Sequence, residues 1–212
     1  MARGVFFSFH YNDVSEFRAN VVRKSRALKT AGNPTTFIDQ SLWEEAEKKS
    51  PTALKKLIEE GMKGSSITSI LNGSETANRK WVRYEIVKSF IEGKGIMLVH
   101  INRIRQRSTS KITAKGKNPL DTIRIVIDDS CTKLYFEELN NGKWIEFELL
   151  PSINNRLKNS LYFTSGSFFR KSEAGNKYKF SELFNLEYCW VNDDGYNNLP
   201  TWVEKAAKQV GR

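Results

Sequence analysis

Short apolar runs recur along the first half of the chain, and polar or amphipathic stretches separate them. Each run is only a few residues long and almost continuously apolar, which is typical of a strand buried on both faces of a parallel sheet. The runs predict four strands, at residues 5–9, 35–38, 67–71 and 96–101.

The intervening segments have the hydrophobic period of helices. Apolar positions recur at helical spacing in residues 14–28 and 78–92. Ser50 and Pro51 are typical of a helix start, and an apolar stripe extends from there to Met62. Strands that alternate with helices in this way predict an α/β fold with a right-handed, parallel, doubly wound sheet.

The second half of the chain has a different pattern. Residues 122–127, 133–139 and 144–149 are strand-like and are separated by turn residues, which predicts an antiparallel meander. Further on, residues 187–191 predict a fifth strand of the parallel sheet, and residues 200–210 predict a terminal helix.

A length of 212 residues fits one domain with an insertion. We expect a single domain over residues 1–212, interrupted between the fourth and fifth strands by an insertion at residues 103–185. The insertion would comprise a basic loop at residues 103–117 and the meander at residues 122–149.

The net charge of +10 is concentrated in one segment, because residues 94–117 hold seven basic side chains and no acidic ones. The basic loop also contains Ser, Thr and Gly, which is loop composition. Clustered Lys and Arg can neutralise nucleic-acid phosphates, so a nucleic-acid-binding module is one interpretation. No base-reading motif accompanies the charge, and we therefore favour a solvated loop over a nucleic-acid partner.

Cysteine and hydropathy patterns narrow the class further. Cys131 and Cys189 lie far apart and have none of the spacings of a zinc site or a redox pair. No apolar run approaches the roughly 18 residues that a membrane helix requires, and no signal-peptide core is present. We expect a cytoplasmic protein with no membrane partner and no metal.

The carboxyl ends of the strands are where open α/β sheets bind ligands. In the predicted arrangement, polar and aromatic side chains gather there, namely Ser8, His10 and Tyr11 after the first strand, Asp39 and Trp43 after the second, and Ser74 after the third. No glycine-rich phosphate fingerprint follows the first strand, which disfavours a standard dinucleotide fold. Two roles stay open for His10, stacking on a base or capping the loop, and two for Trp43, packing or ligand contact.

The helix after the third strand carries the most suggestive pair. Trp81 and Glu85 are four residues apart and therefore share one helix face, beside the apolar stripe, so we expect Glu85 at the rim of the core. We also expect it to face an open cavity that admits a dinucleotide. A carboxylate held against an indole suits the cleavage of an N-glycosidic bond, because it can stabilise positive charge on the ribose. The same spacing also occurs in ordinary contacts on a helix surface.

Four stretches of the chain resemble TIR-like domains, and more closely the ThsB-type TIR proteins of the bacterial Thoeris anti-phage system. The stretches are VFFSFHYNDV, SLWEEA, GSETANRKWVRYEIVKS and WVNDDGYNNLPTWV. The resemblance implies a TIR-type flavodoxin-like fold, a parallel five-stranded sheet flanked by helices with an antiparallel β insertion. It also implies an enzyme with NAD as substrate and no other cofactor, which cleaves the nicotinamide–ribose bond and cyclises ADP-ribose into a signalling isomer.

The resemblance also assigns residues and partners. Glu85 takes the catalytic role and Trp81 an aromatic wall, while substrate-binding loops are implied at Phe9, His10 and Tyr11 and at Asp39 and Trp43. The implied partners are a downstream NAD-degrading effector of the ThsA type, reached through the cyclic messenger, and a phage-derived trigger. Self-association stays open. Cys189 departs from the aspartate expected at its position.

Two further classes of protein share parts of this pattern. A non-enzymatic TIR-like adaptor would use the same surfaces for protein contacts, with Glu85 as a structural residue. A phosphoacceptor domain needs clustered acidic residues at the end of the first strand and an aspartate at the end of the third. Those strands end in Ser8-Phe9-His10 and in Asn72-Gly73, so we set this class aside.

Overall fold

The computed structural model describes residues 3–11, 13, 16–25, 35–38, 40–156 and 168–212. Within them, a five-stranded parallel sheet has the order β10-β4-β3-β1-β2. Its strands are β1 (Val5–Phe9), β2 (Thr35–Thr36), β3 (Ile67–Asn72), β4 (Gly95–His100) and β10 (Glu187–Cys189). This is the flavodoxin-like order, and it confirms the predicted doubly wound sheet.

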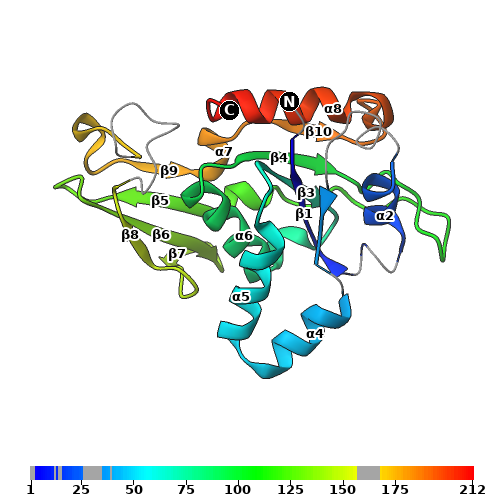
Figure 1. Ribbon diagram of the computed structural model, residues 1–212, viewed down its shortest axis with the longest axis horizontal. Helices are drawn as coiled ribbons and strands as arrows, with labels where there is room; N and C mark the ends of the chain where they lie inside the picture. The colour runs from blue at the N-terminus through cyan, green and yellow to red at the C-terminus, as the bar shows by residue number, and fades with distance from the viewer. Residues whose placement is uncertain (1–2, 12, 14–15, 26–34, 39, 157–167) are drawn as a thin grey trace.

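Helices cover both faces of this sheet (Figure 1). Phe6 of β1 packs in the core on the side of α5 (Pro51–Met62) and α6 (Lys80–Ile91), whereas Phe7 packs on the side of α2 (Arg18–Arg23) and α8 (Gly195–Gln209). The alternation follows from the two-residue period of a strand, which sends successive side chains to opposite faces. Every residue of β3 and β4 is buried, as the continuous apolar runs predicted.

A second, antiparallel sheet follows β4 in the chain and lies beside α6 (Figure 1). It contains β5 (Ile123–Ile127), β6 (Lys133–Asn140), β7 (Lys143–Glu146), β8 (Ser152–Asn154) and β9 (Lys177–Lys179). Ile125 and Phe136 of this sheet join Phe90 of α6 in one core. The predicted meander is confirmed, and β8 and β9 extend it.

Short elements complete the described chain. They are α4 (Gln40–Lys49), α7 (Phe180–Leu183) and three 3₁₀ turns, η1 (Thr76–Asn78), η2 (Pro119–Asp121) and η3 (Lys171–Glu173). The sequence analysis did not predict α4. Most of its side chains are exposed, so its apolar signal is limited to Trp43, which packs against the core, and Ala46, which is buried.

The observed boundaries of helices and strands agree best with the predicted ones where a local sequence signal determines the boundary. The Ser50 side chain accepts a hydrogen bond from the Ala53 N–H at 3.1 Å, which confirms the predicted start of α5. In contrast, α8 begins at Gly195 rather than at Pro200. The Gly195 N–H donates to the Trp190 carbonyl at 2.8 Å, and a Cβ at Gly195 would lie 2.3 Å from the Trp190 ring, so the helix start depends on this close approach.

Two other predicted spans differ. The second strand is limited to Thr35–Thr36, and the described helix α2 spans Arg18–Arg23 inside the predicted range 14–28, part of which lies outside the described residues. No helix in the described part of the chain is both long and apolar enough to cross a membrane.

Candidate active site

Glu85 lies in the middle of α6 and points toward the parallel sheet. Its exposed fraction is 4%, and the Ser8 hydroxyl of β1 donates a hydrogen bond to Glu85 Oε2. Ser8 occupies the same strand face as Phe6, because the two are two positions apart, and this face is the one that α6 covers. Ser8 was expected only as one of the polar residues at the strand end, with no assigned role.

The expected position of Glu85 at the rim of the core is wrong. The parallel sheet covers the inner side of α6, and the antiparallel sheet packs on another side through Phe90 and Phe136, whose ring centroids are 6.4 Å apart. Arg83 of α6 also pairs with Glu138 of β6. A helix between two sheets is buried on most of its circumference, which its amphipathic pattern alone did not indicate.

A second contact fixes the depth of α6 on the sheet. The Ser89 hydroxyl donates to the Glu85 carbonyl at 2.6 Å and lies 2.7 Å from the Thr68 hydroxyl of β3. Ser89 is one helical turn beyond Glu85, so the two side chains share the face that meets the sheet. This contact holds the Glu85 backbone in place beneath Ser8.

Burial dominates the ionisation of Glu85. Loss of hydration raises its pKa to about 8, although the hydrogen bond from Ser8 acts in the opposite direction. The carboxyl group is therefore mostly protonated at neutral pH in the structure as described. A cation placed within a few ångströms would favour the carboxylate again.

Aromatic side chains extend outward from the cavity beside the Glu85 carboxyl group. Phe9, Tyr11, Trp43, Trp81 and Tyr84 form a continuous series of edge-to-face contacts, with successive ring centroids 5.7, 5.3, 6.3 and 5.8 Å apart. We call this series the aromatic wall.

The cavity beside Glu85 is lined by Phe9, Tyr11, Ile38 and Trp43 and measures about 10 Å³. This is room for about one water molecule. The expected open crevice is therefore closed at Glu85 in this structure.

The residues proposed from the sequence do not all converge. Tyr11 and Trp43 line the cavity beside Glu85, whereas Trp81 is buried behind Trp43. His10 lines a different cavity, and Asp39 lies outside the described residues. No three side chains of the metal-binding types gather anywhere in the ranges that the structure describes.

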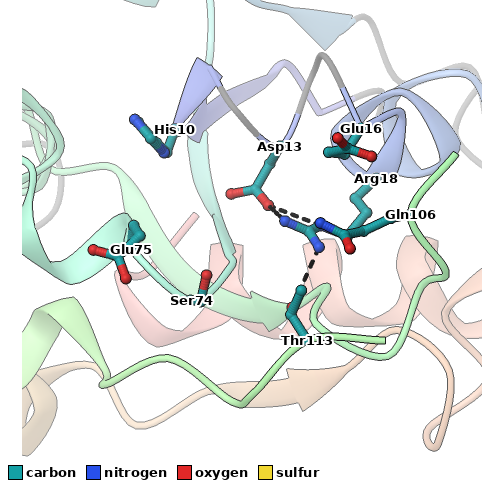
Figure 2. A pocket seen from close by; sticks show the side chains of 8 residues that line it. All are labelled: His10, Asp13, Glu16, Arg18, Ser74, Glu75, Gln106 and Thr113. Carbon is teal, nitrogen blue, oxygen red and sulfur yellow. Dashed lines mark hydrogen bonds and ion pairs between the residues drawn. The ribbon is translucent and has the colours of Figure 1, made fainter. Parts of the chain in front are cut away.

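The second cavity has a volume of about 250 Å³ (Figure 2). Its lining is polar and comprises His10, Asp13, Glu16, Arg18, Ser74, Glu75, Gln106 and Thr113. Arg18 forms a buried ion pair with Asp13 and also donates to the Thr113 hydroxyl at 3.3 Å. Burial lowers the pKa of His10, and the positive charge of Arg79 lowers it further.

The basic loop is tied to the sheet at its carboxyl-terminal end. Lys115 pairs with Glu187 of β10 at 2.9 Å, and the side-chain amide of Asn72 donates to the Lys117 carbonyl at 3.1 Å. Glu187 also lies 2.6 Å from Nε2 of the buried His100. These contacts place the loop beside the second cavity, where Gln106 and Thr113 form one of its walls (Figure 2).

Comparison with known proteins agrees with the resemblance seen in the sequence. The family described as "Thoeris protein ThsB, TIR-like domain" matches residues 6–106, from β1 into the basic loop. A Bacillus cereus (strain MSX-D12) protein named "Putative cyclic ADP-D-ribose synthase ThsB1" is 40% identical over 204 residues. That alignment covers 96% of this chain and 100% of the relative, so it includes the antiparallel sheet.

Proposed function

This chain belongs to the ThsB family of TIR-like proteins of the Thoeris system, and from that premise we propose that it is an NAD-consuming enzyme of anti-phage defence. The name of its Bacillus cereus relative describes a cyclic ADP-D-ribose synthase, which supports a cyclic product. The observation that carries the proposal is the buried Glu85 carboxyl group, held by Ser8 beside a small cavity that Phe9, Tyr11 and Trp43 line.

In the proposed reaction, the bond between C1 of the ribose and the nicotinamide nitrogen breaks. The bonding electron pair goes to the nicotinamide nitrogen, whose ring thereby loses its positive charge, and the ribose becomes an oxocarbenium-like cation. The Glu85 carboxylate stabilises this developing charge, and its effect is strong because the site excludes water. A hydroxyl group of the adenosine part of the same molecule then attacks C1 and releases one proton, which yields free nicotinamide and a cyclic ADP-ribose isomer.

The raised pKa of Glu85 fits this chemistry. The nicotinamide ring of NAD is cationic, so its arrival beside Glu85 favours loss of the proton from the carboxyl group. The free enzyme has a pKa of about 8 at this position, and substrate binding would lower it. The carboxylate thus forms as the cationic nicotinamide ring binds beside it. Binding of NAD would therefore release a proton.

The aromatic wall determines the choice between cyclisation and hydrolysis. Once these aromatic side chains close over bound NAD, they exclude water, and an internal hydroxyl then competes with very little water for C1. The small size of the cavity beside Glu85 means that Tyr11 and Trp43 must move before NAD can reach this residue. We propose that a phage-derived trigger promotes this movement and that the cyclic product carries the signal to a ThsA-type effector.

The decisive experiment compares wild-type chain with Glu85→Gln in cells challenged with phage. Nicotinamide and cyclic ADP-ribose isomers are measured by mass spectrometry, and Glu60→Gln, an exposed glutamate on α5, serves as the matched control. We expect both products to disappear in Glu85→Gln alone. Nicotinamide release that is undiminished in that variant would refute the proposed role of Glu85.

One observation favours the adaptor as a second candidate. A cavity of about 10 Å³ does not admit NAD, and a protein that only binds other proteins needs no larger one. Under this alternative, Glu85→Gln would protect cells from phage as well as the wild type does, and neither chain would release nicotinamide.

A further inference from the structure

The second cavity lies at the point where the winding of the parallel sheet reverses. His10 follows β1, and Ser74 follows β3, the neighbour of β1 in the sheet. The chain passes from β1 to β2 on one side and from β3 to β4 on the other. Open α/β sheets bind ligands beyond the carboxyl ends of the strands at this switch point, so the location itself favours a ligand site.

One carboxylate oxygen of the cavity wall has no hydrogen-bond partner among the described residues. Asp13 is 2% exposed, and Arg18 donates two hydrogen bonds to Oδ1, one of them at 2.9 Å from Nε. The other oxygen, Oδ2, is the one without a partner in the described structure, and Figure 2 shows it directed away from Arg18, toward the space bordered by His10 and Ser74. A carboxylate oxygen that faces a cavity in this way can accept a hydrogen bond from a ligand O–H or N–H.

The neighbouring backbone leaves room for this oxygen. A Cβ at residue 73 would lie 2.3 Å from Asp13 Oδ2, so only glycine fits there. The Ser74 hydroxyl has no hydrogen-bond partner within the described residues either, and it lines the same space. An acceptor and a hydroxyl group are thus presented together to whatever enters the cavity.

Charge defines the class of ligand. The wall holds three carboxylates, Asp13, Glu16 and Glu75, against one guanidinium, that of Arg18, which leaves two negative charges. Such a wall repels phosphate and favours a neutral group rich in hydrogen-bond donors. A carboxylate that accepts hydrogen bonds from the hydroxyls of a ribose is a recurring arrangement at such sheet edges. A volume of about 250 Å³ suits a single nucleoside rather than a dinucleotide.

We propose that this cavity binds the adenosine end of NAD, with Asp13 Oδ2 accepting hydrogen bonds from the ribose hydroxyls while the nicotinamide ribose lies at Glu85. The proposal rests on the proposed function and adds to it the location of the second nucleoside. Ser8, which holds Glu85, and His10, which lines the cavity, are two residues apart, about 7 Å along a strand. One pyrophosphate can bridge that separation around the end of β1.

Two features agree with this placement. Arg79 acts electrostatically on His10, so a positive charge is available near the path of the pyrophosphate, outside the negatively charged cavity. Ring closure also requires the two ends of NAD to approach each other, and two subsites on either side of one strand end hold the substrate folded back.

The test uses the full chain carrying Glu85→Gln, so that NAD is not consumed. Binding of adenosine and of nicotinamide mononucleotide is measured by calorimetry and by ligand-observed NMR. Two further variants are compared on this background. Asp13→Asn removes the charge at Oδ2, and Ser74→Leu fills the cavity without touching the ion pair with Arg18. Ser172→Leu, an exposed serine of η3, is the matched control. Circular dichroism establishes that each variant is folded.

We expect adenosine to bind at least tenfold more weakly to Asp13→Asn and Ser74→Leu than to the control, with nicotinamide mononucleotide unaffected. If Asp13→Asn does not fold, Ser74→Leu alone decides. Adenosine that binds Ser74→Leu as tightly as the control, or that does not bind the chain at all, overturns the proposal while Glu85-dependent cleavage of NAD stands. Adenosine bound in this cavity by a chain that never cleaves NAD would support the subsite and refute the proposed function instead.

Discussion

Ser8→Ala isolates the contribution of one hydrogen bond to the ionisation of Glu85. The Ser8 hydroxyl donates to Glu85 Oε2, and this bond lowers the pKa of a carboxyl group that burial has raised to about 8. Removing the hydroxyl leaves the buried carboxylate without that donor. We expect the pKa of Glu85 to rise further and the activity at neutral pH to fall.

The size of the effect follows from the strength of such bonds. A hydrogen bond to a charged group contributes about 1.5–3 kcal/mol, which corresponds to a change of about one to two pH units in the midpoint of ionisation. With a pKa of about 8, roughly a tenth of Glu85 is ionised at pH 7. A midpoint about one pH unit higher would leave roughly a hundredth, so kcat/KM at pH 7 should fall about tenfold or more.

The assay is the pH dependence of kcat/KM for nicotinamide release, because this parameter reports the ionisation of the free enzyme. Activity should rise with pH through the pKa of Glu85 in the wild type and at higher pH in Ser8→Ala. Ser69→Ala is a matched control, because Ser69 of β3 is also fully buried and its hydroxyl makes no hydrogen bond within the described structure. Its profile should coincide with that of the wild type.

The recovery at high pH separates this explanation from simple structural damage. If Ser8→Ala loses the same fraction of activity at every pH, the hydroxyl does not act through the ionisation of Glu85. An unchanged profile would show that the hydrogen bond is not formed in the functional enzyme. Either result refutes the reasoning above.

Two other changes test the burial of the site. Ionisation of Glu85 opposes folding, because the folded pKa of about 8 exceeds the ordinary glutamate value, so stability is lost as pH rises toward 8. Glu85→Gln should therefore stabilise the chain by on the order of 4 kcal/mol at pH 8 and by less than about 1 kcal/mol at pH 5. Thermal melts of the variant and the wild type measure this difference. A difference that does not change with pH would contradict the prediction. Trp43→Ala should open the aromatic wall and shift the products from cyclic toward linear ADP-ribose, which mass spectrometry measures. Leu42→Ala, at an exposed neighbour on α4, is the control. An equal ratio of cyclic to linear product in the two variants would count against the prediction.

The sequence alone determined the frame of the molecule. The run at Val5–Phe9 is apolar at every position except Ser8 because both faces of β1 are covered, and that pattern located the strand to the residue. Ser50 located the start of α5 because its capping hydrogen bond is local. The helix after β3, which carries Glu85, was also predicted, since its spacing is readable without knowing its neighbours.

Tertiary structure alone decided what surrounds the candidate site. The burial of Glu85 depends on β1 and on Ile38 and Trp43, which line the cavity at its carboxyl group, and the partnership with Ser8 depends on how α6 sits on β1. Closure by Tyr11 and Trp43 and the close approach of Asp13 to Gly73 likewise arise from contacts between distant segments. The local hydrophobic period indicates which residues become buried on folding. The hydration and charge of a single atom depend on every segment that packs around it, so only the folded chain determines them.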